Sequence, residues 1–486
     1  MRDPGRMVGI FLFRAKKIYL YGYIIKLMES QLWEAVFKFN LDEPLSEYGF
    51  STRLENENYW PANFAAKAIV EYKKFMYLAA ISDEMVSPSV IVDIVWHQHL
   101  IFTQSYDAFC TVLGKRIAHI PSTHTKSDFA LFDRAKSRTE KLYKENFGVQ
   151  PAEIWNAEDI YAPLSMNRAK STIEKRIGIA FGLLIPLFAV AYYLLQPLYI
   201  RIDNPYFIEG YSGVFLISII SLEVYNSGRV SKIIKQWPQN SFVFNLAPLE
   251  LVYLKSNGIT PVIHGVVNNL VANKNIRITS DEKLITDDVA NINNPAMFCA
   301  AQAVAANPGI SYPALVNLLK LKPAFNKTVR SMDALKAHIR NSEQLIRIFD
   351  LNFAILYVVL LLGLVRLATG ILREKPVTII IGFLVVFALI AIGYLYRLTT
   401  IITTYKIPAF YKDGITPTDP EYDTWDWQYF LLGSAVFVWS FAPLTTYVDN
   451  NTFFTTDTSG SGSSCGSNCG GGSSCGGSSC GGCGSD

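Results

Sequence analysis

Apolar residues recur at intervals of three and four along residues 28–165, which is the spacing of one buried helix face. ANFAAKAIVEYKKFMYLAAIS predicts one long helix. SPSVIVDIVWHQHLIFTQSYDAFCTVLG predicts a second, with Ser87 as N-cap, Pro88 in the first turn and Gly114 at the end. KSDFALFDRAKSRTEKLYKENFG predicts a third, closed by Gly148. Together these patterns predict a small, soluble, all-helical domain.

The first 27 residues are apolar, but Arg14, Lys16 and Lys17 interrupt them. The uninterrupted run is too short to span a membrane and ends in no small-residue cleavage site. A regular amphipathic pattern begins at Met28. Residues 1–27 are therefore interpreted as an extension or as a misassigned start.

Long apolar runs follow the helical domain. A bilayer-spanning helix needs about 20 such residues. The predicted spans form two transmembrane hairpins, 177–199 with 206–226 and 349–371 with 376–396. A further apolar segment, 427–448, is either a fifth span or an interfacial helix, since Trp anchors at the interface. Four spans leave the C-terminus on the side of the helical domain, and five leave it on the other.

Basic residues set the expected orientation. Arg168, Lys170, Lys175 and Arg176 precede the first span, whereas Arg201 is the nearby basic residue after it. The positive-inside rule therefore places the helical domain in the cytoplasm, at the inner membrane of a bacterium. The net charge of +3 is too small to imply a nucleic-acid partner. The expected partners are the lipid bilayer and other proteins or a second copy of the chain.

Residues 237–348 return to a soluble pattern. They predict helix, turn, helix and hairpin, the order of a winged helix, for which DNA binding is the sharpest functional interpretation. The candidate recognition helix, 260–272, has no Lys or Arg among its polar positions His264, Asn268 and Asn269. Because DNA affinity depends on cations that contact phosphates, an interaction module beside the membrane is favoured and DNA is not an expected partner. The expected strand positions are Ile276, Ile278, Leu284 and Ile285.

Four of the six histidines lie between residues 97 and 124. Helical positions i and i+2 are ~200° apart, so His97 and His99 point to nearly opposite faces. Asp93 has the i, i+4 spacing that lets a carboxylate orient His97. His119 and His124 follow in a segment able to fold back onto this face. The hypothesis is a zinc or copper site built from Asp93, His97, His119 and His124; the alternative is a packed helix.

His99 shares the other face of the same helix with Trp96 and Tyr106. These three side chains are predicted to pack together as a structural face. No glutamate stands at HExxH spacing and no cysteine pairs with the histidines, so no complete catalytic constellation is present. No residue is assigned a catalytic role.

The last 32 residues, 455–486, are rich in Gly, Ser and Cys and predict a disordered tail, because such a composition builds no packed core. Only the last two of its five cysteines form a C-x-x-C pair, so a zinc knuckle is not indicated. The remaining hypotheses are soft-metal binding, including Cu(I), disulfide cross-linking and covalent modification of the thiols. The cysteines are Cys465, Cys469, Cys475, Cys480 and Cys483.

DIVWHQHL, YDAFC, GKRIAHIPS and FGVQPAEIW resemble the conserved core of the glycine-rich domain-containing protein family, known from plants, fungi and bacteria. The resemblance covers roughly residues 50–160. That family has no well-established enzymatic activity, so the resemblance assigns no mechanism. The resemblance depends mainly on Trp96, His97, His99, Cys110 and His119.

A second resemblance covers roughly residues 200–486. LAPLELVYL, the helix-turn-helix-like unit, the closing helical hairpin and the Gly/Cys-rich end are similar to a bacterial membrane domain of uncharacterised function. Many members of that group end in Gly-Cys tails whose role is not established.

These patterns favour a non-enzymatic, multi-pass membrane protein that binds or assembles other molecules and carries a thiol-rich tail. The first alternative is a membrane-anchored, metal-dependent enzyme that uses the histidine cluster. The second alternative is a membrane-tethered DNA-binding regulator. The fold class expected in all three cases is mainly α, with transmembrane helices, an inserted winged-helix-like domain and a disordered tail.

Overall fold

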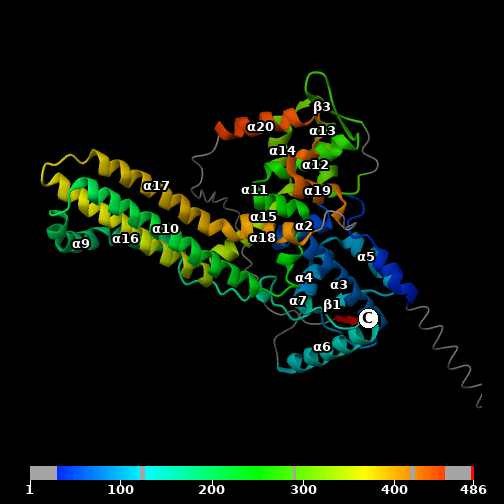
Figure 1. Cartoon of the computed structure of the whole chain (residues 1–486). Helices are drawn as coiled ribbons and strands as arrows, with labels where there is room; N and C mark the ends of the chain where they lie inside the picture. Colours follow the sequence, from blue (N-terminus) through cyan, green and yellow to red (C-terminus); the bar gives the residue numbers. More distant parts are fainter. Residues whose placement is uncertain (1–29, 121–125, 288–291, 416–421, 455–482, 486) are drawn as a thin grey trace, which may run out of the picture. The chain divides into compact units, whose positions relative to one another are not determined.

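The chain folds into two compact units, each described here by itself. The computed structural model describes residues 30–120, 126–287, 292–415, 422–454 and 483–485, so the predicted extension 1–27 lies outside it. The first unit comprises 1–160, 263–328 and 437–486 and is called the soluble unit after the soluble pattern that the sequence predicts for much of it. The second, the membrane unit, comprises 161–262 and 329–436. Both are mainly helical, as the sequence predicts (Figure 1).

The N-terminal part of the soluble unit is a helical cluster around large buried side chains. Residues 30–38 are helical. Phe75, Trp96 and Phe109 are fully buried at its centre. The elements that follow are α2 (Phe50–Asn58), α3 (Ala62–Ile81), α4 (Val90–Ile101), α5 (Thr103–Leu113), β1 (Ile117–His119), α6 (Lys126–Phe147) and α7 (Ala152–Trp155).

The helix predicted between Ser87 and Gly114 is two helices, and its N-cap is not Ser87. The Ser89 hydroxyl accepts a hydrogen bond from the Val92 backbone N–H, so α4 begins after Ser89. The helix breaks at Phe102, whose ψ of 63° is not helical. Gly114 ends α5 with a φ of 78°, which glycine adopts without strain.

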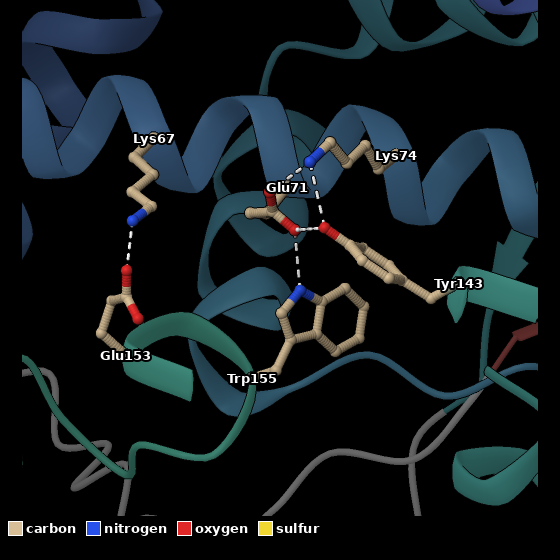
Figure 2. A network of polar contacts seen from close by, with 6 residues as sticks. All are labelled: Lys67, Glu71, Lys74, Tyr143, Glu153 and Trp155. Carbon is tan, nitrogen blue, oxygen red and sulfur yellow. Dashed lines mark hydrogen bonds and ion pairs between the residues drawn. The ribbon is translucent and has the colours of Figure 1, made fainter. Parts of the chain in front are cut away.

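A buried carboxylate connects α3 to α6 and α7 (Figure 2). Glu71 accepts hydrogen bonds from the Tyr143 hydroxyl and the Trp155 indole N–H, both at 2.8 Å. Lys74 lies 2.7 Å from its other oxygen and also donates to Tyr143. Burial and the neighbouring carboxylate raise the pKa of Tyr143, so the phenol stays protonated and continues to donate.

The remaining parts of the soluble unit come from later in the chain. The hairpin lies where the sequence predicts it, because Ile276 pairs with Thr286 and Ile278 with Leu284. A short third strand adds antiparallel to the second. These parts are α12 (Thr260–Ala272), which begins in the membrane unit, β2 (Ile276–Ile278), β3 (Lys283–Thr286), α13 (Pro295–Ala306), β4 (Ile310–Ser311), α14 (Tyr312–Lys320), α20 (Ala442–Phe454) and β5 (Cys483–Ser485).

The predicted soluble segment 237–348 is therefore divided between the two units rather than forming one compact body. Contacts join the three separate pieces of the soluble unit. Lys327 forms a 3.0 Å ion pair with Glu55. Asn268 accepts a 2.8 Å hydrogen bond from the Val438 backbone N–H. Burial raises the pKa of Glu55, although Lys327 opposes that shift.

The membrane unit is a bundle of long apolar helices (Figure 1). Within the described residues, three helices are long and apolar enough to cross a membrane, beginning at Pro205, Glu343 and Thr378. A fourth candidate is bent by 50° between α8 and α9. Pro186 causes the break, since it has no N–H for the carbonyl of Gly182. The unit contains α8 (Ile173–Gly182), α9 (Leu184–Tyr199), α10 (Asn204–Lys235), α11 (Pro248–Ser256), α15 (Pro323–Arg340, shared with the soluble unit), α16 (Glu343–Ile371), α17 (Thr378–Ile401), the π-helical turn η3 (Ile402–Lys406) and α18 (Ile407–Gly414).

Close approach of these helices requires a glycine. A Cβ placed on Gly363 of α16 would lie 2.6 Å from Leu384 of α17 and 2.7 Å from the Tyr211 ring of α10, so any larger residue would require these side chains to shift. Phe215 of α10 stacks on Phe387 of α17 with ring centroids 4.0 Å apart. The three helices are thus packed by side chains and are not merely adjacent.

The segment 427–448, expected to be either a fifth span or an interfacial helix, is not one helix. It is divided among α19 (Trp425–Leu432), η5 (Gly433–Val436) and the first half of α20. Gly433 stops α19 with a φ of 66°. Phe441 is fully buried and contacts Tyr312 edge to face, which packs the start of α20 inside the soluble unit.

Candidate metal centre

Asp93 and His97 lie on the same face of α4, one helical turn apart. Their i, i+4 spacing brings His97 Nε2 to 3.5 Å from Asp93 Oδ2. Asp93 is buried, with 7% of its surface exposed, whereas the His97 side chain is half exposed. The Asp93 carboxylate is therefore buried, and the His97 imidazole beside it reaches the surface.

The short strand β1 delivers the third side chain to this face. After Gly114 ends α5, the chain reverses and runs through Ile117 to His119. The His119 ring contacts the Trp96 ring edge to face at 4.5 Å. Its Nε2 lies 3.1 Å from Asp93 Oδ1 and 3.0 Å from His97 Nε2.

These three ligand atoms fit one metal ion. One ligand atom from each residue lies within 4.8 Å of the other two. The two imidazole Nε2 atoms are 3.0 Å apart, and each lies near a different Asp93 oxygen, at 3.1 Å for His119 and 3.5 Å for His97. Ligands 2.0–2.1 Å from a tetrahedral zinc ion are roughly 3.3 Å apart. A single N–H on His119 satisfies one of its two neighbours and not both. A cation at the centre would satisfy all three electron-pair donors at once.

His99 lies on the opposite side of α4 and has a different environment. It is fully buried, with Nδ1 2.8 Å from the Tyr72 hydroxyl and Nε2 3.1 Å from the Ser105 hydroxyl. Burial lowers the pKa of His99 to about 4, so its ring is neutral at physiological pH. The His99 ring packs against Tyr106 with centroids 5.3 Å apart. Paired with hydroxyl groups on both nitrogens, His99 belongs to the core.

Trp96 and Tyr106 support the position of β1. The Trp96 indole N–H donates to the Tyr106 hydroxyl at 3.1 Å, and that hydroxyl donates to the Ile117 carbonyl. Ile117 is two residues before His119, so this chain of bonds holds the strand that carries the ligand. Sequence reasoning grouped Trp96 with Tyr106 but missed this role, and it missed Tyr72 and Ser105 entirely.

The structure places the other proposed ligands as follows. His124 lies outside the described residues, as do Cys465, Cys469, Cys475 and Cys480. The backbone of Cys483 is described, and strand β5 pairs antiparallel with β1 in a register that sets Cys483 opposite His119 (Figure 1). The end of the cysteine-rich tail therefore pairs with the strand that carries one candidate ligand.

Comparison with known proteins gives one weak similarity. The chain is 27% identical over 116 residues to glycine-rich domain-containing protein 1 of Arabidopsis thaliana. The match covers 23% of this chain and 13% of that protein. It supports the resemblance to glycine-rich domain-containing proteins and extends no further. No family model matches the chain. No solved structure matches it.

Proposed function

We propose that this protein is a membrane-anchored metal-binding protein whose soluble unit holds a transition-metal ion between Asp93, His97 and His119. The observation that carries the proposal is the convergence of two imidazole Nε2 atoms and one carboxylate on a single point. Two nitrogen donors and one oxygen donor suit zinc first, and copper or iron are the alternatives with the same donors. Half-exposed His97 leaves one side of the ion open to solvent.

The proposed topology has four crossings. The pieces 1–160, 263–328 and 437–486 belong to one compact unit, so an even number of crossings must separate them. Between the first two pieces lie the bent pair α8–α9 and α10, which requires the bent pair to count as one span. Between the last two lie α16 and α17. This parity argument supports a C-terminal tail on the same side as the helical domain.

The basic residues before the first span support a cytoplasmic location for that side. Bacterial inner membrane is the proposed location, in line with the second sequence resemblance. Cytoplasmic thiols are kept reduced, so tail cysteines there would be available as thiolate ligands rather than as disulfides. The register of β5 opposite β1 supports a contribution of the tail to the same metal.

The test is the metal content of the full-length protein purified in detergent. His119→Ala and Asp93→Ala should each lower zinc affinity more than 100-fold, because loss of a direct ligand exceeds the 10–100-fold effect of its supporting partners. His338→Ala, outside the cluster, is the matched control and should leave metal content unchanged. Metal retained equally by all three variants would contradict the site. Loading the protein with cobalt tests separately whether the tail cysteines bind the metal. If they do, the sulfur-to-cobalt absorption band should disappear when all five are changed to serine.

A metal-dependent enzyme is the second candidate, and the open side of the site favours it. Three protein ligands plus an exchangeable water is the arrangement of catalytic zinc sites. Regulation by DNA binding has less support. The polar side chains of α12 are internal, since His264, Asn268 and Asn269 are each at least nine-tenths buried. Both ring nitrogens of His264 have partners inside the unit, Tyr312 and Asp449, so the ring is not available to contact DNA bases.

A further inference from the structure

The membrane unit contains a cavity of about 260 Å³ between α10, α17 and η3. Its polar lining includes Glu223, Asn226, Ser227, Tyr394, Arg397 and Lys406. The two cations outnumber the one carboxylate, so the cavity favours an anion. Its volume lies just below the roughly 300–1,000 Å³ of sites for whole small molecules, which suits a head group rather than a complete ligand.

The floor of this cavity is a rigid polar cluster. Asn226 is 3% exposed and Asn352 is fully buried. Their amides exchange two 2.8 Å hydrogen bonds, and Asn226 also donates to the Tyr394 hydroxyl at 2.8 Å. These bonds tie α10, α16 and α17 together at one level. Asn226 and Tyr394, which both line the cavity, are thereby held by hydrogen bonds to each other and to the adjoining helix.

The mouth of the cavity carries the exchangeable charges. Arg397 faces Glu223 with contacts of 2.8 and 3.4 Å, and both side chains are about half exposed. An ion pair this exposed contributes little, so Arg397 can replace the carboxylate by another anion at low cost. The guanidinium binds phosphate in the same two-pronged geometry.

A π-helical turn forms the remaining wall. Ile402–Lys406 makes i→i+5 bonds where α17 would otherwise continue, and Tyr405 and Lys406 line the cavity. Such turns are rare and occur frequently at functional sites. The extra residue in this turn changes the direction in which the following side chains point. This observation is independent of the charges.

The position of the cavity at the ends of two apolar runs indicates what kind of ligand it binds. Arg397 directly follows the apolar run 376–396, and Glu223 lies in the last turn of the run 206–226. This level is where lipid head groups meet acyl chains. The neighbouring outward faces of α10 and α17 are apolar and exposed, with Ile220, Val224 and Ile392 each at least 63% exposed. Acyl chains would cover these side chains.

We propose that this cavity binds the phosphate of an acidic membrane phospholipid, with Arg397 and Lys406 as its cationic contacts. Basic pockets between transmembrane helices are a recurrent way of holding anionic head groups. The acyl chains of the lipid would lie along α10 and α17. The proposal does not depend on the metal site, which lies in the other unit.

The experiment measures phosphatidylglycerol retained by the full-length protein in detergent, by native mass spectrometry, with phosphatidylcholine as the neutral competitor. Arg397→Gln with Lys406→Gln should lower phosphatidylglycerol affinity about tenfold or more. Arg373→Gln with Lys375→Gln removes two exposed cations between α16 and α17, beyond the far end of both helices, and should change little. Lys406→Gln alone is the milder variant if the double variant does not fold.

The direction in which Glu223→Gln changes phosphatidylglycerol affinity distinguishes the proposed site from a purely structural ion pair. The substitution removes the competing carboxylate and frees Arg397, so phosphatidylglycerol affinity should rise, whereas a purely structural ion pair predicts loss of stability without a gain in binding. Equal losses in the cavity and control variants would overturn the proposal. Displacement of the lipid by millimolar inorganic phosphate would identify a free anion site and overturn the lipid assignment. Metal content measured in the same variants should not change.

Discussion

The soluble unit contains two clusters of polar side chains that differ in how completely they are satisfied. At Glu71, three donors surround one buried carboxylate, and every group has a partner within the cluster (Figure 2). At Asp93, a carboxylate and two imidazoles converge, all three of which can donate a lone pair to a cation. One of them, His97, is half exposed. Buried polar groups that satisfy one another stabilise a fold. Two imidazoles and a carboxylate that converge in this way are the donor groups of the metal site proposed above.

The comparison predicts that the two clusters fail differently. Glu71→Ala leaves Tyr143, Trp155 and Lys74 without their common acceptor and should destabilise the contacts of α6 and α7 by about 3–5 kcal/mol. Hydrogen exchange of α6 and α7 in the full-length protein measures this loss. Metal affinity of the molecules that remain folded should stay close to that of the unaltered protein.

Lys67→Met is the matched control for that variant. Lys67 pairs with Glu153 within the same region (Figure 2). Its side chain is 40% exposed. Loss of such a pair should cost about 1 kcal/mol or less. If Lys67→Met lost as much protection as Glu71→Ala, burial would not explain the difference in stability that the two contacts are expected to contribute.

The next largest effect is a pH dependence at His99. Its pKa in the folded protein is about 4, below the ordinary 6.5, so the unfolded chain takes up a proton more readily. The stabilisation is complete above about pH 6.5 and is lost as pH falls towards 4, with a total of about 3 kcal/mol. Amide protection of α4, corrected for intrinsic exchange, should fall over this range.

His99→Gln tests the assignment of that pH dependence. The amide cannot titrate, so the variant should be less stable at pH 7 but nearly insensitive between pH 6.5 and 4. An unchanged slope in this variant would assign the titration to another group.

The smallest effect concerns the support of the metal site. Tyr106→Phe removes the hydroxyl that joins Trp96 to the Ile117 carbonyl but keeps all three proposed ligands. Metal affinity should fall about 10–100-fold, as is typical when a supporting partner is lost. Competition with a chelator measures it. An unaltered affinity would mean that β1 holds His119 without this bond.

The sequence by itself determined several features of the protein. The helical periodicity of the apolar residues determined its mainly α character. The length of the stretches without charged residues determined its apolar spans. Both are local properties of the sequence. The opposite facing of His97 and His99 also follows from helical geometry alone. A buried Glu71 was readable in principle, since it falls on the apolar face of α3 beside Tyr72 and Phe75.

Only the tertiary structure decided which distant groups meet. The approach of His119 to Asp93 depends on the reversal after Gly114 and on the Tyr106 bond to Ile117, neither of which has a periodic signal. The partition of residues 237–348 between two units depends on contacts with residues hundreds of positions away, such as Lys327 with Glu55. Spacing along the chain sets which face a side chain occupies, whereas packing energy summed over the whole unit sets what lies opposite that face.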